Sequence, residues 1–336
     1  MIGRPARGTL LLCLLCALVS CSSSATPVSH HHRHRAVGSP TRPAATGNSE
    51  RPSRLSVRVL PWRLPEPVAR EAAVATSRGL VVAGGLAAGD QSTATAYRLD
   101  LTSGHAAALA DLPVPVHDVG GATAKGEPEV VGGGNATEQD VVQKARRRGG
   151  WRISGHLPSV RSDLVAVTVG ARVFAIGGYD GVTPALPDVL VSTRGGVFHA
   201  FARLRLAVRY AAVARSDGAL WVFGGERNGV EVSAIQRIDL GTGRVQVAGH
   251  LPRPLGHASA VRLGSRVLLA GGRTSGTRLT AAMWWFDPAA PDAMHRAGSL
   301  PSPLADSAVV ATSGAAYLVG GETPTLSDRV LRLTLS

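Results

Sequence analysis

The sequence predicts an all-β fold, a six-bladed β-propeller, from two features that repeat with one period. A Gly-Gly pair follows a short apolar run six times, in the stretches Val81 to Gly85, Val130 to Gly134, Val173 to Gly178, Leu220 to Gly225, Val267 to Gly272 and Tyr317 to Gly321. A leucine, followed by proline in five of six cases, precedes each run at Leu64, Leu112, Leu157, Leu204, Leu251 and Leu300. These leucines are 48, 45, 47, 47 and 49 residues apart. Such a period, with four short strand-like stretches per unit, is typical of propeller blades.

The paired glycines are expected to be structural. At the end of a strand near a crowded axis, the first glycine can turn the chain at positive φ, and the second lets neighbouring backbones approach closely. We therefore assign no phosphate-binding role to Gly84, Gly85 or their equivalents. No GxGxxG motif follows a strand and opens a helix in this sequence.

The two ends of the repeat predict how the ring closes. The last unit stops at Ser336, directly after Arg329 to Leu335, which matches a third strand and leaves the fourth strand missing. Leu55 to Leu60 precede the first marker leucine, where a fourth strand belongs. We therefore expect the N-terminal segment to complete the last blade and to cover the sheet edge that would otherwise be exposed.

The first twenty residues predict export. A basic start precedes an apolar run from Leu10 to Val19 that is too short to span a bilayer, which is the layout of a secretory signal peptide. Leu18 to Cys21 resembles the lipobox of bacterial lipoproteins, in which the cysteine receives a diacylglycerol. We expect residues 1–20 to be removed and Cys21 to be lipid-anchored on the extracytoplasmic side of the cell membrane, since two or three acyl chains hold a protein there. A plain signal peptide with an incidental cysteine is the alternative.

Residues 21–54 predict a flexible tether, because their Ser, Pro, Thr, Ala and Arg side chains leave few large apolar groups to bury. Within the tether, His30 to Arg35 could bind a transition metal or an anionic surface, although a solvated basic spacer is favoured. The sequence has three cysteines, of which Cys13 and Cys16 lie inside the signal peptide and Cys21 follows it. The domain at 55–336 therefore has no cysteine for a disulfide or a thiolate metal site. We expect no metal and no other cofactor.

The net charge of +13 would suggest a nucleic-acid partner if it were clustered, but arginines scattered along the chain supply most of it. Export also makes nucleic acid an unsuitable partner. The one dense run, Lys144 to Arg148, precedes Gly149-Gly150 and is interpreted as an exposed hairpin tip.

The repeat resembles the kelch family, which includes the central domain of galactose oxidase, and the resemblance covers residues 55–336. It rests on an Arg-x-Asp start at Arg161 to Asp163, on the apolar-Gly-Gly ends, and on an aromatic or apolar residue with aspartate at Tyr97 to Asp100, Ile238-Asp239 and Phe286-Asp287. The chain departs from the kelch pattern at the tryptophan six residues before each Leu-Pro marker. Trp151 keeps it and Phe198 replaces it, whereas Ala106, Val245 and Met294 are not aromatic.

Polar residues recur where a ligand site of such a propeller would lie. Six residues after each marker leucine stands a column that is polar in every unit: Arg70, Asp118, Asp163, Tyr210, His257 and Asp306. The residues just after the Gly-Gly pairs are expected on the same face: Asp180, Glu226, Arg227, Arg273 and Glu322. These groups could hold the hydroxyls or an amino group of a small ligand. Alternatively, they hydrogen-bond the backbone where blades meet or line a water-filled channel.

The fold and the lipid anchor together predict a monomeric, membrane-anchored binding module at the cell envelope, which contacts a glycan, a small molecule, a peptide or an envelope protein. The alternative is a sugar-modifying enzyme such as a sialic-acid-type epimerase, which needs an acid and a base around a sugar. A copper-radical sugar oxidase is excluded, because its cofactor requires a cysteine cross-linked to tyrosine. No HExxH, GxSxG or P-loop motif is present, and no catalytic residue is assigned.

Overall fold

The structure is a computed structural model that describes residues 54–336 except residues 148, 194 and 195. The expected signal peptide, the lipidation site Cys21 and the expected tether up to residue 53 lie outside the described residues. Every regular element of the described part is a strand. It contains no helix that is long and apolar enough to cross a membrane.

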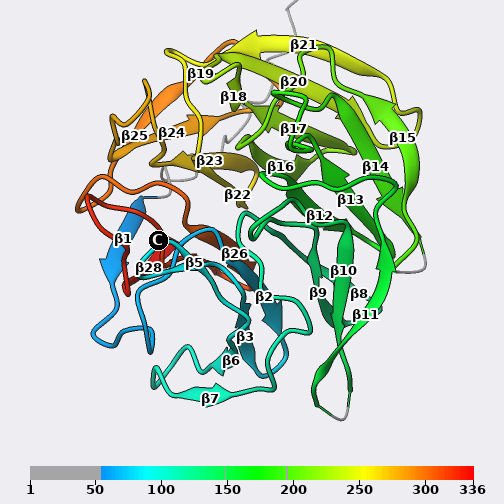
Figure 1. Ribbon diagram of the computed structural model, residues 1–336. Helices are drawn as coiled ribbons and strands as arrows, with labels where there is room; N and C mark the ends of the chain where they lie inside the picture. The colour runs from blue at the N-terminus through cyan, green and yellow to red at the C-terminus, as the bar shows by residue number, and fades with distance from the viewer. Residues whose placement is uncertain (1–53, 148, 194–195) are drawn as a thin grey trace, which may run out of the picture. The chain divides into compact units, whose positions relative to one another are not determined.

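Six four-stranded antiparallel sheets surround a central axis (Figure 1). We number these sheets as blades in chain order and name the innermost strand first. Blade 1 contains β2 (Ala72–Thr76), β3 (Gly79–Ala83), β6 (Ala96–Leu99) and β7 (Ala106–Ala108). Blade 2 contains β8 (Gly120–Ala124), β9 (Glu127–Val131), β10 (Val141–Ala145) and β11 (Trp151–His156). Blade 3 contains β12 (Val165–Val169), β13 (Arg172–Ile176), β14 (Asp188–Ser192) and β15 (His199–Arg203).

The second half of the ring repeats this order. Blade 4 contains β16 (Ala212–Ser216), β17 (Ala219–Phe223), β20 (Ala234–Asp239) and β21 (Val245–His250). Blade 5 contains β22 (Ser259–Leu263), β23 (Arg266–Ala270), β24 (Ala282–Phe286) and β25 (His295–Ser299). Blade 6 contains β26 (Ala308–Thr312), β27 (Ala315–Val319), β28 (Val330–Leu335) and β1 (Leu55–Val59). Two short hairpins extend from blades 1 and 4: β4 (Leu86–Ala87) with β5 (Gln91–Ser92), and β18 (Glu226–Arg227) with β19 (Val230–Glu231).

The fourth strand of blade 6 comes from the other end of the chain, as the sequence predicts. β1 pairs antiparallel with β28 along its whole length, from Leu55 opposite Leu335 to Val59 opposite Leu331. The backbone of Arg54 and Ser336 continues the ladder by one more pair of hydrogen bonds, at 3.0 and 3.1 Å. This pairing closes the ring and leaves β28 no free edge.

The apolar core is divided among the six seams between neighbouring blades. Each seam holds its own cluster of buried side chains, with Phe174, Trp221 and Phe286 among the largest. Every marker leucine is buried, and each lies in a different cluster: Leu64, Leu112, Leu157, Leu204, Leu251 and Leu300. The leucine therefore recurs because every seam buries one such side chain.

The positions that depart from the kelch tryptophan also face these seams. Trp151 and Phe198 are buried in the clusters between blades 1 and 2 and between blades 2 and 3. Val245, Met294 and Ala106 lie at the clusters of three further seams. Smaller side chains thus occupy the same place without changing the register of the repeat.

The Gly-Gly pairs join each blade to the next one. In blade 5, Gly271 and Gly272 have φ angles of 67° and 103°, and a Cβ atom on Gly271 would clash with the carbonyl oxygen of Leu304. The amide of Gly272 donates to that same oxygen at 2.8 Å. The other five pairs repeat this geometry, so the expected structural role of the glycines is confirmed.

The basic run at the tip of blade 2 differs from its interpretation as a fully exposed turn. Lys144 is buried, donates to the carbonyl oxygen of Ala124 at 2.9 Å, and lies 3.3 Å from a carboxylate oxygen of Glu127. Arg146 and Arg147 are exposed. The prediction is therefore wrong for Lys144, because the β-strand alternation turns its side chain into the blade.

Candidate functional site

The predicted polar column lies at the bend that leads into the innermost strand of each blade. All six residues have a φ between 51° and 59°, in the left-handed region that L-residues rarely adopt: Arg70, Asp118, Asp163, Tyr210, His257 and Asp306. The residue before each of them forms a β-bridge with the residue that follows the Gly-Gly pair of the same blade. The same backbone geometry therefore directs six side chains, of four residue types, toward the axis.

A belt of backbone hydrogen bonds links this column around the ring. The amide of each column residue donates to the carbonyl oxygen of the previous column residue at 2.9 to 3.0 Å in five of the six seams. Between blades 1 and 2 the side chain of Arg70 makes the link, with Nη1 donating to Oδ2 of Asp118 at 3.2 Å. The belt fixes where each side chain starts, whatever its chemistry.

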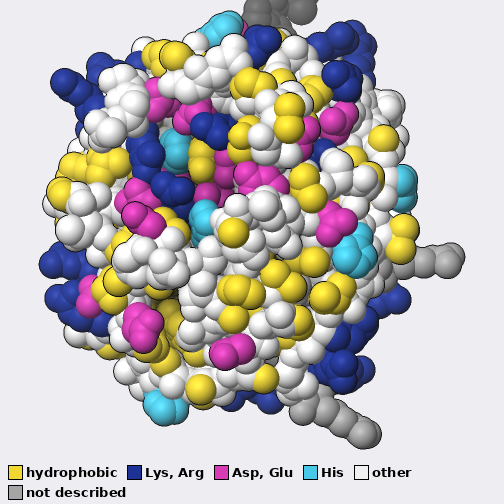
Figure 2. All heavy atoms as spheres, in the orientation of Figure 1, with side chains coloured by type: hydrophobic (Ala, Val, Ile, Leu, Met, Phe, Trp, Pro, Cys, Tyr) yellow, Lys and Arg dark blue, Asp and Glu magenta, His cyan; other side chains and the backbone are white. Residues whose placement is uncertain are grey.

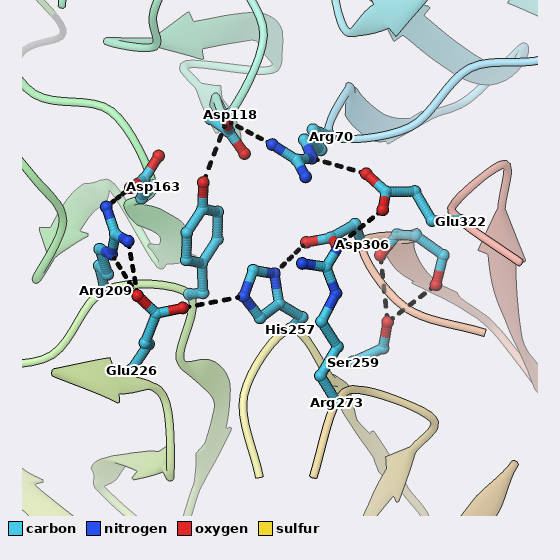
Figure 3. A network of polar contacts seen from close by, with 12 residues as sticks. Arg70, Asp118, Asp163, Arg209, Glu226, His257, Ser259, Arg273, Asp306 and Glu322 are labelled. Atoms are coloured by element: carbon cyan, nitrogen blue, oxygen red, sulfur yellow. Dashed lines mark hydrogen bonds and ion pairs between the residues drawn. The ribbon is translucent and has the colours of Figure 1, made fainter. Parts of the chain in front are cut away.

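The side chains at this end of the axis form an alternating series of negative and positive groups (Figure 3). Five carboxylates, three guanidinium groups and one imidazole take part. Each guanidinium group contacts two carboxylates. The series runs Asp118, Arg70, Glu322, Arg273, Asp306, His257, Glu226, Arg209 and Asp163.

The first half of the series crosses the seam between blades 1 and 6. Arg70 donates from Nε to Oε1 of Glu322 at 2.8 Å, besides its bond to Asp118. Arg273 donates from Nη2 to Oδ2 of Asp306 at 2.9 Å and also contacts Glu322. These bonds join blades 1, 2, 5 and 6 through side chains alone.

The second half of the series centres on His257. Its Nδ1 lies 2.7 Å from Oδ1 of Asp306, and its Nε2 lies 3.4 Å from Oε2 of Glu226. Burial disfavours the imidazolium, but the charge of Asp306 and the hydrogen bonds to both carboxylates outweigh it and raise the pKa of His257. The hydrogen bond from His257, with Arg209, lowers the pKa of Glu226 to about 2. His257 therefore fits its place in the series as a cation.

Both ends of the series are carboxylates, and they meet at the seam between blades 2 and 3. Asp163 is held by Arg209, whose Nη1 donates to Oδ2 at 3.2 Å, and Asp118 is held by Arg70. No guanidinium group of the series stands between the two aspartates. His117 places its Nε2 3.5 Å from Oδ2 of Asp118, and burial together with the charge of Arg70 lowers the pKa of this imidazole. Burial raises the pKa of Asp163 to about 6, and the charge of Asp118 adds to this shift. Burial likewise raises the pKa of Asp118 to about 6 against the charge of Arg70.

Tyr210 reaches across the axis beside this junction. Its hydroxyl donates to Oδ2 of Asp118 at 3.3 Å, and its ring stacks on that of His257 with centroids 3.9 Å apart. Burial raises the pKa of Tyr210, so the hydroxyl keeps its proton. The tyrosine thereby connects blades 2, 4 and 5.

A cavity of about 650 Å³ runs along the axis beneath the column. The innermost strands of all six blades line it, from the column to the fifth residue after it. On the face shown in Figure 2, Arg, Asp, Glu and His side chains gather over its centre. The side chains of Asp118 and Asp163 are only 6% and 4% exposed, so the polar groups largely close this end of the cavity.

Two of the predicted site residues lie apart from the charge series and from Tyr210. Asp180 accepts bonds from the backbone of Val182 and Thr183 in its own loop. Burial disfavours its charged form, but these bonds together outweigh burial and lower its pKa. Arg227 is exposed on β18. The other nine predicted residues come together at the end of the axis, and whether they bind a ligand stays a prediction.

Sequence reasoning missed Arg209 and Glu71. Arg209 directly precedes the column, where the other blades have Ala69, His117, Ser162, Gly256 and Ala305, so no periodic signal marks it. Glu71 directly follows the column and is buried, and both of its carboxyl oxygens lack hydrogen-bonding side-chain partners. Burial raises the pKa of Glu71 to about 8.

No metal site accompanies these groups in the part of the chain that the structure describes. No three His, Cys, Asp or Glu side chains there are arranged to hold a metal ion. The groups available to a ligand at this site are hydrogen-bond donors and acceptors that carry charge.

Comparisons with known proteins support the architecture. No protein-family model matches the sequence. A stretch of 108 residues, 31% of this chain, is 29% identical to the human Kelch repeat and BTB domain-containing protein 13. The match spans only 24% of that relative's length. The solved structure described as "Structure of YjhT" superimposes with a TM-score of 0.69 and 16% sequence identity, over 82% of this chain and 98% of that one. The repeat, the closed ring and these similarities together identify the described chain as a six-bladed β-propeller of the kelch type.

Proposed function

We propose that this protein is an extracytoplasmic binding module, anchored in the membrane through Cys21, that holds a small molecule by a protonated amino group between Asp118 and Asp163. The observation that carries the proposal is the break in the charge series. Every other carboxylate of the series has a cation on both sides, whereas no guanidinium group stands between these two. The imidazole of His117 lies 3.5 Å from Asp118, but burial and the charge of Arg70 lower its pKa, so it does not supply a cation at neutral pH. An ammonium group there would complete the alternation.

The electrostatics favour a cation over an anion at this junction. The five carboxylates outnumber the four cations of the series, which are three guanidinium groups and the imidazolium of His257, and each cation already contacts two carboxylates. With pKa values of about 6, Asp118 and Asp163 are mostly ionised at neutral pH although they are buried. An opposite charge within a few ångströms favours ionised carboxylates, so ligand binding and ionisation support each other.

The cavity supplies the room. Its volume of about 650 Å³ lies within the range of small-molecule sites. Both aspartates line it, together with the Tyr210 hydroxyl, which can rotate to bond a second ligand group.

The proposal is tested by a thermal-shift screen of amino sugars, amino acids and short peptides, each paired with its N-acetylated form. Amines are expected to raise the melting temperature at pH 7.5, and their acetylated forms are not. The shift should be smaller at pH 5, because the aspartates are then protonated. Equal responses to both forms of every pair would overturn the ammonium site.

A double variant locates the site. Asp118→Asn with Asp163→Asn removes both charges and keeps the shape, and it should abolish the response to amines. Asp180→Asn is the matched control, since Asp180 lies outside the charge series and should leave the response unchanged. If the control and the double variant respond alike, the amine binds elsewhere.

An enzyme of the sugar-epimerase type is the second candidate. It is favoured by one observation, the two adjacent carboxyl groups with pKa values of about 6, since groups that titrate near neutral pH can donate and accept protons. NMR exchange measurements between the anomers of N-acetylneuraminic acid test it. Faster exchange with the wild type than with the double variant would establish the enzyme and displace the binding module.

The anchor has its own test. Metabolic labelling with an alkyne fatty acid in a bacterial host is expected to tag the full-length protein and not the Cys21→Ala variant. Equal labelling of the two would contradict acylation at Cys21.

A further inference from the structure

The charged residues that line the central cavity are confined to its two ends. One end carries the column with its excess of carboxylates. At the other end the lining ends in Ala75, Thr123, Thr168, Arg215, Arg262 and Ala311. Arg215 and Arg262 stand at the same position in the neighbouring blades 4 and 5, so this end is cationic.

The cationic end is the open one. Arg215 and Arg262 are exposed, and the side chain of Arg262 is 46% exposed. Arg262 makes only a long contact of 3.8 Å with Asp217 and a bond from Nε to the carbonyl oxygen of Gly264. At the opposite end the column side chains fill the axis. A ligand therefore enters between the arginines and meets the aspartates last.

The wall between the two ends suits an extended backbone. Each innermost strand stands at the end of its sheet order, so the edge that faces the axis has no strand partner: β2, β8, β12, β16, β22 and β26. Such edges present N–H and C=O groups, which a peptide can use by strand addition. At Thr123 both backbone groups are already bonded to the hydroxyl of Thr168, so this residue is not available to a peptide. Small side chains such as Ala73 and Ala166 line the cavity. Next to the column, β8 packs closely on β2 and β12, since a Cβ atom on Gly121 would lie 3.3 Å from the backbone of Ala73, so the free edges lie further along the cavity.

The length of the cavity sets the length of the ligand. From Tyr210 to Arg215 and from His257 to Arg262 the chain advances five residues, which spans roughly 16 Å in an extended strand. An extended peptide of four or five residues has the same span, and its two charged termini lie at its ends.

We propose that the cavity binds a short linear peptide of four or five residues, with its N-terminal ammonium between Asp118 and Asp163 and its C-terminal carboxylate between Arg215 and Arg262. This inference rests on the ammonium site of the proposed function and adds the arginine entrance, the extended conformation and the peptide class. Charge complementarity at both ends gives the peptide one direction in the cavity.

The experiment is isothermal titration calorimetry with penta-alanine at pH 7.5. The free peptide should bind, and both its C-terminal amide and its N-acetyl form should bind at least tenfold more weakly. The amide tests the arginine entrance, and the N-acetyl form tests the aspartates. If penta-alanine gives no heat at millimolar concentration, or if its amide binds equally well, the peptide proposal is overturned.

Two variants on the exposed end complete the test without disturbing the core. Arg215→Ala with Arg262→Ala should weaken penta-alanine at least tenfold and make the acid and the amide bind alike. Arg78→Ala is the control, because Arg78 is an exposed arginine in the turn between β2 and β3 of blade 1, outside the cavity lining, and it should leave the affinity unchanged.

The outcomes separate this inference from the proposed function. If the arginine variant binds penta-alanine as the wild type does, while Asp118→Asn with Asp163→Asn abolishes amine binding, the ammonium site stands and the peptide entrance is wrong. If the aspartate variant keeps full amine binding, the proposed function fails by itself.

Discussion

The seam between blades 6 and 1 and the seam between blades 2 and 3 share one backbone bond but differ in side-chain chemistry. In the first, the amide of Arg70 donates to Asp306, and in the second, the amide of Asp163 donates to Asp118, both at 3.0 Å. At the first seam Arg70 also pairs with Glu322. At the second, two carboxylates meet. The same backbone connection thus carries a salt bridge across one seam and two carboxylates with no shared cation at the other, where Arg70 and Arg209 each hold one of them.

The difference separates structural roles from binding roles. At a seam where opposite charges pair, the side chains stabilise the fold. At a seam where two carboxylates lie close together, their repulsion destabilises the fold unless a bound cation offsets it. Substitutions at the two seams should therefore change stability in opposite directions. The predictions below run from the largest expected effect to the smallest.

Removal of β1 should have the largest effect. Deleting residues 55–59 withdraws Leu55, Val57 and Val59 from the cluster between blades 5 and 6 and exposes the edge of β28. Burial of each such side chain contributes about 1.5–3 kcal/mol, so we expect the deleted protein to lose its cooperative thermal transition. Arg58→Ala, on the exposed side of the same strand, should melt like the wild type. A deletion variant that melts normally would show that β1 does not close the ring.

Breaking the paired seam should have the next largest effect. Arg70→Met leaves Glu322 and Asp118 without a shared cation, and loss of one partner of a buried ion pair costs about 3–5 kcal/mol. Because the side chain of Arg70 is 18% exposed, the lower end of this range is expected in urea denaturation. Arg227→Met, exposed on the same face, should change stability by less than about 0.5 kcal/mol. Similar losses in the two variants would contradict the structural role of the pair.

Glu71 is a buried carboxyl group without an ion-pair partner at the paired seam. Its presence predicts that the stability of the protein depends on pH. The equivalent residues in the other blades are Val119, Leu164, Ala211, Ala258 and Ser307. Burial raises the pKa of Glu71 to about 8, so the folded protein holds a proton that the unfolded chain releases above pH 4.5. This group therefore lowers stability as pH rises from about 4.5 to about 8.

Glu71→Gln should remove this dependence. We expect the variant to become more stable relative to the wild type as pH rises from 5 to 8. The difference in the free energy of unfolding should grow by on the order of a few kcal/mol, and the difference in melting temperature should grow with it. Thermal melts at each pH value measure the difference. A difference that stays constant over this range would mean that Glu71 ionises as freely when folded as when unfolded.

The smallest effect is expected at the unpaired seam. The raised pKa of Asp163 means that the wild type loses stability as pH rises from about 4 to about 6. Asp163→Asn lacks this loss, so its stability relative to the wild type should increase across that window, by about 2–3 kcal/mol at most. Arg209 keeps its contact with Glu226 in this variant. A relative stability that falls with rising pH would place Asp163 among the structural pairs.

The sequence was sufficient to predict the blade number, the ring closure and the polar column, because each depends on positions that recur with the period. Leu64 and its five equivalents recur since every seam buries one, and the Gly-Gly pairs recur since every blade approaches the next at the same point. The charge series could not be predicted, because it depends on which side chains reach across the axis. Arg209 joins it from a position with no periodic signal, while Asp180 turns back to its own loop.

The backbone belt has a consequence for protein engineering. Because six residues as different as arginine, aspartate, tyrosine and histidine adopt the same left-handed bend, the scaffold fixes the aim of each side chain independently of its identity. The bend costs roughly 1–2 kcal/mol for an ordinary L-residue, and the local bonds offset it at all six positions. A library randomised at these six codons would therefore place different side chains on the same backbone. Glycine at any of them would relieve the left-handed backbone strain, but it would also remove one charged or polar partner from the site.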